Sequence, residues 1–258
     1  MSEFSVQVEI TGDVGMLRWQ EQRVDSETLE AAVSMAADDA IIAHELRRLQ
    51  VDLPANDVVA RRALQRCGFR LEGRLRSAQR VGNDDLVDVL IYARLAIDPV
   101  YGPQGFSGVM DSVLPMKRMI GHAVFRDSRG RVLLTETRYK EDWELPGGIV
   151  EAGESPRVGA EREVMEEIGL AVTFGNAALI DWMPPYLGWS DAIEFIFDGG
   201  TMTDDVAAGI TVTDPRELAA VHWVAPEDLD EHVTELSARR IRLLLSGWTG
   251  MTEDGRPL

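Results

Sequence analysis

Apolar and polar residues alternate over residues 4–10, a period of two that predicts a β-strand near the start of the chain. Ser26 can cap a helix over residues 27–44, which are rich in Ala, Met and Ile. A second helix, capped by Asn56 or Asp57, is predicted to run through Gln65 and to stop at Gly68. Further strands are predicted over 16–24, 46–53, 69–75 and 85–96, with turns at 12–15 and 81–84. The mixture predicts a small α/β domain over residues 1–98.

Residues 98–108 are dense in proline and glycine, which interrupt regular structure. This composition predicts a linker over residues 99–113. Its aromatic residues suggest that it lies against a domain surface. A second domain is then expected from residue 114 to residue 258.

The second domain opens with apolar runs at 119–125 and 132–136, which flank a polar turn at 126–131 and predict a hairpin. Residues 199–214 are small and polar, and we expect them to be mobile. Further strands are predicted over 171–182, 192–197 and 219–224, and a closing helix within 226–245.

The most informative stretch is a predicted helix that begins after the N-cap residue Ser155 and ends at Gly169. Within it, Glu163, Glu166 and Glu167 are spaced i, i+3 and i+4, so they share one face. Three like charges on one face repel each other. Such a face is expected to hold a cation.

Carboxylate oxygens at this density suit Mg²⁺ or Mn²⁺, which prefer hard oxygen ligands. Arg162 can hold one carboxylate in place by a bidentate pair. The preceding loop, residues 147–153, contains three glycines and can point backbone groups at a metal or a phosphate. The alternative is a solvated acidic helix face with ordinary salt-bridge partners.

The spacing of these residues resembles the Nudix box. Gly148 is followed by five residues and Glu154, then by seven residues and the run 162–170, Arg-Glu-Val-Met-Glu-Glu-Ile-Gly-Leu. The resemblance covers roughly the last 140 residues, a plausible size for one domain. It implies an α/β/α sandwich with a mixed sheet. It also implies Mg²⁺- or Mn²⁺-dependent hydrolysis of the diphosphate linkage in a nucleoside diphosphate derivative.

The resemblance also implies roles for individual residues. Glu166 and Glu167 are the first-choice metal ligands, and Glu163 is a ligand or the general base. The Gly147 carbonyl is a further candidate ligand. The remaining expectations are Arg162 as the group that orients the carboxylates, Gly148 and Glu154 as the residues that close the loop onto the helix, Glu217 as the leading base outside the helix and Asp214 as the second.

Recognition of a base or a ribose needs aromatic faces. Trp143 and Tyr139 flank the expected cleft, and Arg138 can meet a phosphate, although a solvated strand end is the alternative. His122 and His222 lie in predicted strands, where packed or hydrogen-bonded histidines are commoner than ligands.

The first domain has a resemblance of its own. Asn56, Ala60, the run 64–76, Asp88 and Tyr92 resemble the C-terminal half of a GNAT-type acetyltransferase. That family binds the acetyl-CoA pyrophosphate with a glycine-rich loop, whereas residues 18–26 contain no glycine. We therefore expect a partial GNAT-like domain without acetyltransferase activity, which docks, dimerises or covers a substrate.

Composition limits the possible partners. The net charge of −18 disfavours nucleic-acid polymers, because an acidic surface repels phosphate backbones. No apolar run approaches the roughly 18 residues that a membrane helix needs, and the first residues do not read as a signal peptide. Cys67 is the only cysteine, which excludes an intrachain disulfide and favours the cytoplasm. A small phosphorylated nucleotide remains the expected substrate, and the resemblance makes a homodimer possible.

Two functions of different classes thus remain open for the second domain. One is a metal-dependent nucleotide diphosphatase. The other is a nucleotide-sensing binding protein whose site has the same shape but does not hydrolyse the nucleotide. The complete set of carboxylates favours the enzyme.

Overall fold

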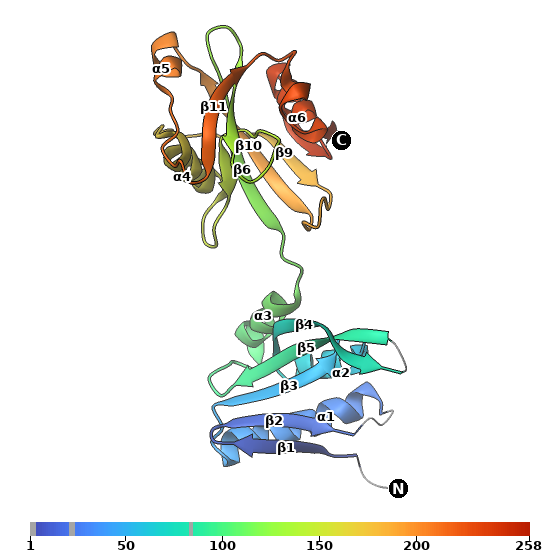
Figure 1. Cartoon of the computed structure of the whole chain (residues 1–258). Helices are drawn as coiled ribbons and strands as arrows, with labels where there is room; N and C mark the ends of the chain where they lie inside the picture. Colours follow the sequence, from blue (N-terminus) through green and yellow to red (C-terminus); the bar gives the residue numbers. More distant parts are fainter. Residues whose placement is uncertain (1–3, 21–23, 83–84) are drawn as a thin grey trace. The chain divides into compact units, whose positions relative to one another are not determined.

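The computed structural model describes residues 4–20, 24–82 and 85–258. It divides into two compact units, Met1–Pro115 and Met116–Leu258 (Figure 1). The described part of the chain includes no helix that is long and apolar enough to cross a membrane.

The first unit is built on a five-stranded sheet with the order β1-β2-β3-β5-β4. Only β2 and β3 pair in parallel; the other neighbours are antiparallel. The strands are β1 (Val6–Thr11), β2 (Val14–Trp19), β3 (Arg48–Pro54), β4 (Arg70–Val81) and β5 (Asp85–Leu95). Parts of the predicted strand 16–24 and of the predicted turn 81–84 fall on residues 21–23 and 83–84, outside the described residues.

Side-chain caps begin the helices of this unit. The predicted cap Ser26 is wrong by one residue: Asp25 accepts the Thr28 N–H at 2.8 Å at the start of α1 (Ser26–Asp38), which continues as the π-helical turn η1 (Asp39–Ala43). Asp57 accepts the Ala60 N–H at 2.9 Å at the start of α2 (Val58–Arg66). The buried faces of both helices pack with the sheet in one apolar core.

The predicted linker is largely wrong: residues 102–113 form a helix, α3 (Gly102–Val113), which packs against β4 within the first unit. Its glycines permit close contacts and do not break the helix. A Cβ on Gly105 would lie 2.5 Å from the backbone of Val100, and one on Gly108 would lie 2.6 Å from the Arg70 guanidinium.

The second unit is built on a mixed sheet with the order β11-β7-β6-β10-β9-β12-β13, and β8 also pairs with β6. The β6–β10 and β9–β12 pairs are parallel. The strands are β6 (Arg118–Arg126), β7 (Val132–Thr137), β8 (Gly147–Ile149), β9 (Ala177–Met183), β10 (Ala192–Thr201), β11 (Leu218–Val224), β12 (Gly250–Glu253) and β13 (Arg256–Pro257).

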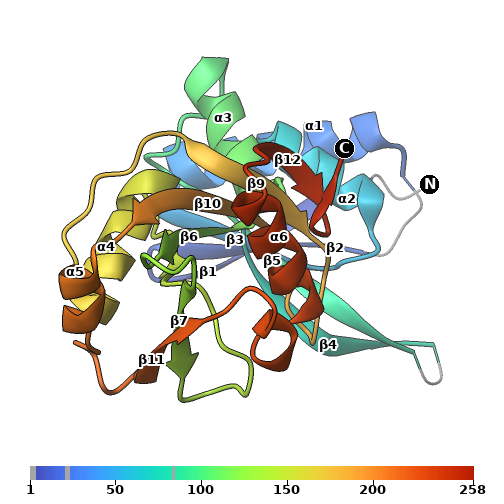
Figure 2. The same cartoon turned by 90° about the horizontal axis from the view of Figure 1, so that it is seen from above.

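Helices cover both faces of this sheet, as Figures 1 and 2 show for α4 (Pro156–Ile168) and α6 (Glu235–Leu245). Alternate residues of the central strands supply two cores. Ala123 and Phe125 pack on the α4 side, whereas Val124 and Ile196 pack on the α6 side. The expected α/β/α sandwich with a mixed sheet is therefore confirmed.

Several predicted elements differ from the structure. The strand expected at 171–182 begins only at Ala177. Residues 199–214, expected to be a mobile loop, include the end of β10 and a short helix, α5 (Asp204–Gly209). The closing region contains a 3₁₀ turn, η2 (Leu229–Glu231), before α6, and the hairpin β12–β13 after it was not predicted.

The α3 contacts give a stability prediction. Gly105→Ala should destabilise the first unit by ~1–3 kcal/mol, because the new methyl group meets backbone that cannot move aside. Gly108→Ala is the matched control: the Arg70 side chain can swing away, and the gain in helix propensity of about 1 kcal/mol offsets the loss. Urea unfolding monitored by circular dichroism measures both. Equal stabilities of the two variants would contradict this account of α3.

Cys67 gives a pH prediction. The thiol is 3% exposed and donates to the Glu30 carbonyl, and burial raises its pKa to about 11. The folded state disfavours the thiolate. The folding stability that the neutral Cys67 thiol contributes is therefore complete below pH ~8.5, the ordinary thiol pKa, and is lost as the pH rises toward 11. The stability difference between wild type and Cys67→Ala should therefore shrink between pH 8 and pH 11. A difference that is constant with pH would show that Cys67 does not titrate in this way.

Candidate active site

Helix α4 presents the acidic face that the sequence predicts. The Ser155 hydroxyl accepts the Val158 N–H at 3.3 Å and caps the start of the helix. Gly169 ends it in the left-handed conformation, with φ of 67°. Both ends lie where the sequence places them, because each is decided by its own capping residue.

The glycines before the helix let the backbone approach its carboxylates. The Gly147 N–H donates to Oε2 of Glu167 at 2.8 Å. Gly147 has a φ of 131°, and a Cβ there would collide with the Gly121 carbonyl oxygen. A Cβ on Gly148 would lie 3.1 Å from Cδ of Glu163. Side chains at these positions would push the loop off the helix.

Arg162 joins the loop to the acidic face. Its Nε donates to Oε1 of Glu154 at 2.9 Å, and its Nη2 donates to the Ile149 carbonyl at 3.1 Å. Its Nη1 donates to Oε1 of Glu163 and to Oε2 of Glu166, both at 3.0 Å. One guanidinium therefore orients three carboxylates.

Negative charge at this face exceeds the positive charge that compensates it. Burial raises the pKa of Glu167 to about 7; the charges of Glu163 and Glu217 add to the rise, and a backbone hydrogen bond and His122 oppose it. Burial also raises the pKa of Glu163, against the opposite effect of Arg162. Removal from water is thus the main cause that disfavours ionisation of the buried Glu167 and the partly buried Glu163.

The two bases expected outside the helix have different surroundings. Glu217 is exposed, and its charge contributes to the raised pKa of both Glu163 and Glu167. Asp214 accepts two hydrogen bonds from the Arg216 guanidinium, at 3.0 and 2.6 Å. These bonds lower the pKa of Asp214 to about 2, which makes it a poor base.

The structure corrects the expectation that Trp143 binds a substrate base. Its ring is stacked between His222, with centroids 3.9 Å apart, and His232, with centroids 4.1 Å apart. Both faces of the indole are therefore covered, and neither can stack on a base. The tryptophan holds its loop against β11 and the turn after η2.

The other two expected recognition residues lie near the carboxylates. The Arg138 Nε donates to the Pro215 carbonyl at 2.8 Å, and its N–H donates to the Glu217 carbonyl at 2.9 Å. The Tyr139 side chain is exposed at 67%, and desolvation, followed by the charges of Glu217 and Glu167, raises the pKa of its phenol.

The two strand histidines are hydrogen-bonded, as expected. His122 Nδ1 lies 2.8 Å from Oε1 of Glu194, and His222 Nε2 lies 2.8 Å from Oε2 of Glu136. Sequence reasoning missed the partner of His122 and the buried Arg240 beyond it. Glu194 does carry a signal, since it interrupts an otherwise apolar strand at 192–197.

The donor set fits a hard divalent cation by its chemistry. Glu163, Glu166 and Glu167 offer carboxylate oxygens on one helix face, and burial raises the pKa of Glu163 and Glu167. Their present partners are Arg162 and the Gly147 N–H. Within residues 4–20, 24–82 and 85–258, no three His, Cys, Asp or Glu side chains already converge as a ligand cluster. A bound ion would therefore have to draw these carboxylates closer together.

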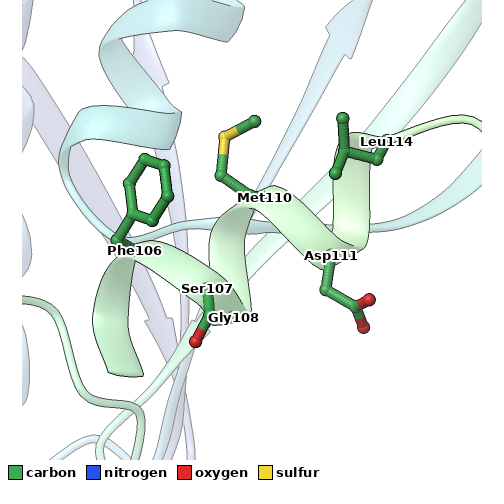
Figure 3. Close-up of a pocket in the computed structure, with 6 residues that line it drawn as sticks. All are labelled: Phe106, Ser107, Gly108, Met110, Asp111 and Leu114. Carbon is green, nitrogen blue, oxygen red and sulfur yellow. The ribbon is translucent and has the colours of Figure 1, made fainter. Parts of the chain in front are cut away.

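An open hollow on α3 of the first unit does not offer comparable chemistry (Figure 3). The side chains of Phe106, Met110 and Leu114 line it together with Asp111, and no basic group is among its lining residues. It is not suited to a phosphate.

The start of α1 is likewise unsuited to the acetyl-CoA pyrophosphate. The Asp25 carboxylate accepts both the N–H and the hydroxyl of Thr28, at 2.8 and 2.9 Å, and Glu27 adds a charge in the first turn. Acidic groups therefore occupy the position that an anion needs.

Comparison with known proteins supports the Nudix resemblance of the second unit. A family model described as "NUDIX domain" matches residues 116–244. A "MutT-like protein" from Streptomyces ambofaciens is 30% identical over 118 residues, 46% of this chain and 70% of that protein. A "Putative 8-oxo-dGTP diphosphatase" from Bacillus subtilis (strain 168) is 29% identical over 117 residues, 45% of this chain and 72% of that protein.

A solved structure of an "acetyltransferase of GNAT family from Streptococcus pneumoniae" covers 35% of this chain and 56% of its own, with 19% identity. Its TM-score of 0.32 is too low to carry an argument about the first unit. The family match spans half of the sequence and contains the whole acidic helix with its glycine loop. The chain therefore belongs to the Nudix family.

Proposed function

We propose that this Nudix hydrolase cleaves the diphosphate linkage of a nucleoside diphosphate derivative with the help of Mg²⁺ or Mn²⁺. The derivative is ADP-ribose-like, a dinucleotide or a modified nucleoside triphosphate. One observation carries the proposal: the glycine loop and the three α4 carboxylates are tied together. Glu167 accepts the Gly147 N–H, whereas Glu163 and Glu166 share the guanidinium of Arg162, which also binds the Ile149 carbonyl of the loop.

The reaction adds water to one phosphorus and breaks its bond to the bridging oxygen, which leaves with the other phosphate. A bound divalent ion neutralises the diphosphate charge and lowers the pKa of water. Glu166 and Glu167 are the groups that would hold it, with Glu163 and the Gly147 carbonyl as further ligands. Glu154 and Arg162 hold the glycine loop and these side chains in place.

Two carboxylates remain candidates for the general base. Glu163 has a raised pKa and lies on the acidic face. Glu217 stands close to that face on the loop before β11 and is exposed to water. Asp214 is the weaker candidate because Arg216 binds it.

Tyr139 and Arg138 are the side chains that we assign to substrate binding. Both lie on the segment that follows β7, near Glu217. An exposed tyrosine ring can stack on a base, and a guanidinium can bind a phosphate.

A nucleotide-sensing binding protein is the second candidate function. The observation in its favour is that Arg162 already binds two of the three candidate ligands, Glu163 and Glu166. It predicts tight binding of a nucleotide with no phosphate-containing product.

Incubation with Mg²⁺ or Mn²⁺ and a panel of ADP-ribose, dinucleotide cofactors and oxidised nucleoside triphosphates tests the proposed hydrolysis. We expect turnover of at least one of them, and none after chelation of the metal. Glu166→Gln should lower kcat by more than ~100-fold, the upper end for groups that only orient a metal ligand. Glu235→Gln, on the exposed face of α6, is the control. Binding without product in the wild type would favour the sensor.

Arg162→Lys tests the orienting role. A lysine ammonium cannot bridge Glu154, Glu163 and Glu166 at once, so kcat or the apparent metal affinity should fall about 10–100-fold. Arg157→Lys is the matched control, since Arg157 is exposed and pairs with Glu161 one turn further along the helix surface. Steady-state kinetics at several Mg²⁺ concentrations measures both. Equal behaviour of the two variants would remove Arg162 from the site.

A further inference from the structure

Charged groups are buried on the face of the second sheet that α6 covers. They come from three strands and the helix: His122 of β6, Asp181 of β9, Glu194 of β10 and Arg240 of α6. Their exposed fractions are 8%, 0%, 2% and 4%. None of them belongs to the Nudix box.

These groups form one connected network. Arg240 Nη1 donates to Oε2 of Glu194 and, at 3.4 Å, to Oδ2 of Asp181. Although burial acts in the opposite direction, Arg240 and His122 keep the pKa of Glu194 below its usual range. An ionised carboxylate only accepts hydrogen bonds, so His122 Nδ1 is the donor in its 2.8 Å contact with Glu194.

The network also reaches the C-terminal hairpin. Oδ1 of Asp181 accepts the Thr252 hydroxyl at 2.6 Å and the Gly255 N–H at 2.9 Å. Both carboxylate oxygens of Asp181 are therefore engaged, and β12 and β13 are fixed to the same charged cluster.

At its other end the network touches the glycine loop. Strands β6 and β8 pair His122 with Gly147. A Cβ on Gly147 would lie 2.8 Å from Cδ2 of the His122 ring, so the ring edge lies directly against this glycine. The N–H of the same residue donates to Glu167 at 2.8 Å. Only a backbone unit separates the His122 ring from the Glu167 carboxylate.

Stability alone does not explain this arrangement. Apolar side chains of similar volume often replace a buried ionic network with no loss of stability, or with a gain. A network of hydrogen bonds does, however, fix the orientation of each member more narrowly than apolar packing does. The member that it fixes next to the glycine loop is the His122 ring.

We propose that His122 is a positioning residue: Glu194, itself held by Arg240, clamps the His122 ring, and the ring fixes the Gly147 backbone that orients Glu167. The role of Glu167 as a metal ligand rests on the proposed function, whereas the contacts that hold the Gly147 backbone do not depend on it. The C-terminal hairpin helps to hold Arg240 in place, because Thr252 and Gly255 bind Asp181, which Arg240 also binds.

Two substitutions of His122 remove its ring and its hydrogen bond to Glu194 separately. His122→Asn keeps an amide donor for Glu194 but removes the ring edge that lies on Gly147. His122→Phe keeps a ring but removes the donor. His44→Asn, at an exposed histidine of the first unit, is the matched control.

Hydrogen–deuterium exchange of the metal-free protein provides a readout that does not depend on turnover. Peptides covering 145–150 should exchange about tenfold faster in both His122 variants, as expected for the loss of one hydrogen bond. The rest of the second unit and the His44→Asn control should exchange like the wild type. A faster exchange spread evenly over the second unit would mean that His122 only supports the fold and would overturn the proposal.

Kinetics provides the second readout. The kcat of both His122 variants should fall about 10–100-fold, as for groups that orient a metal ligand, with KM changed less than about twofold. Wild-type exchange and turnover in both variants would overturn the positioning role. If the wild type cleaves no diphosphate, the proposed function fails, and the exchange data still decide whether the clamp holds Gly147.

Discussion

The second unit depends on holding like charges together on one helix face. Two unit charges about 4 Å apart interact by about 4 kcal/mol at the effective dielectric constant of a protein surface. The structure offsets this repulsion among the α4 carboxylates in two ways. Arg162 is shared between Glu163 and Glu166, and the Gly147 N–H holds Glu167. Even so, burial raises the pKa of Glu167 to about 7, because it takes the carboxylate out of water. A divalent cation would favour the ionised carboxylate, which links the electrostatics of the helix to the proposed chemistry.

Close approach of backbone to helix makes this arrangement possible. A Cβ on Gly121 would lie 2.8 Å from the Pro156 carbonyl oxygen, and one on Gly159 would lie 3.1 Å from Val150. Because these positions carry no side chains, α4 lies almost directly on β6 and β8. Groups on the two faces of the sheet therefore lie close together: the His122 ring, on the α6 face, lies against Gly147, whose N–H donates to Glu167 of α4.

The first unit has its own core, and its described residues include no comparable cluster of carboxylates. Its sheet and helices bury apolar residues in one cluster. Acidic side chains stand at the start of α1, where an anion-binding helix needs free N–H groups. A docking, dimerising or substrate-covering role, without acetyl transfer, stays our prediction for this unit.

The sequence by itself determined the features that depend on neighbours along the chain. Ser155 and Gly169 mark the ends of α4, and the i, i+3, i+4 spacing places its carboxylates on one face. The same local spacing identified the family. Tertiary structure decided the contacts between distant segments. It covered both faces of Trp143 with His222 and His232, which lie far along the chain. It turned the predicted linker into α3 because Gly105 fits against Val100, and it set the His122 ring between Glu194 and Gly147. Helix caps and periodicity are short-range properties, whereas stacking and buried ion pairing depend on which residues the fold brings together.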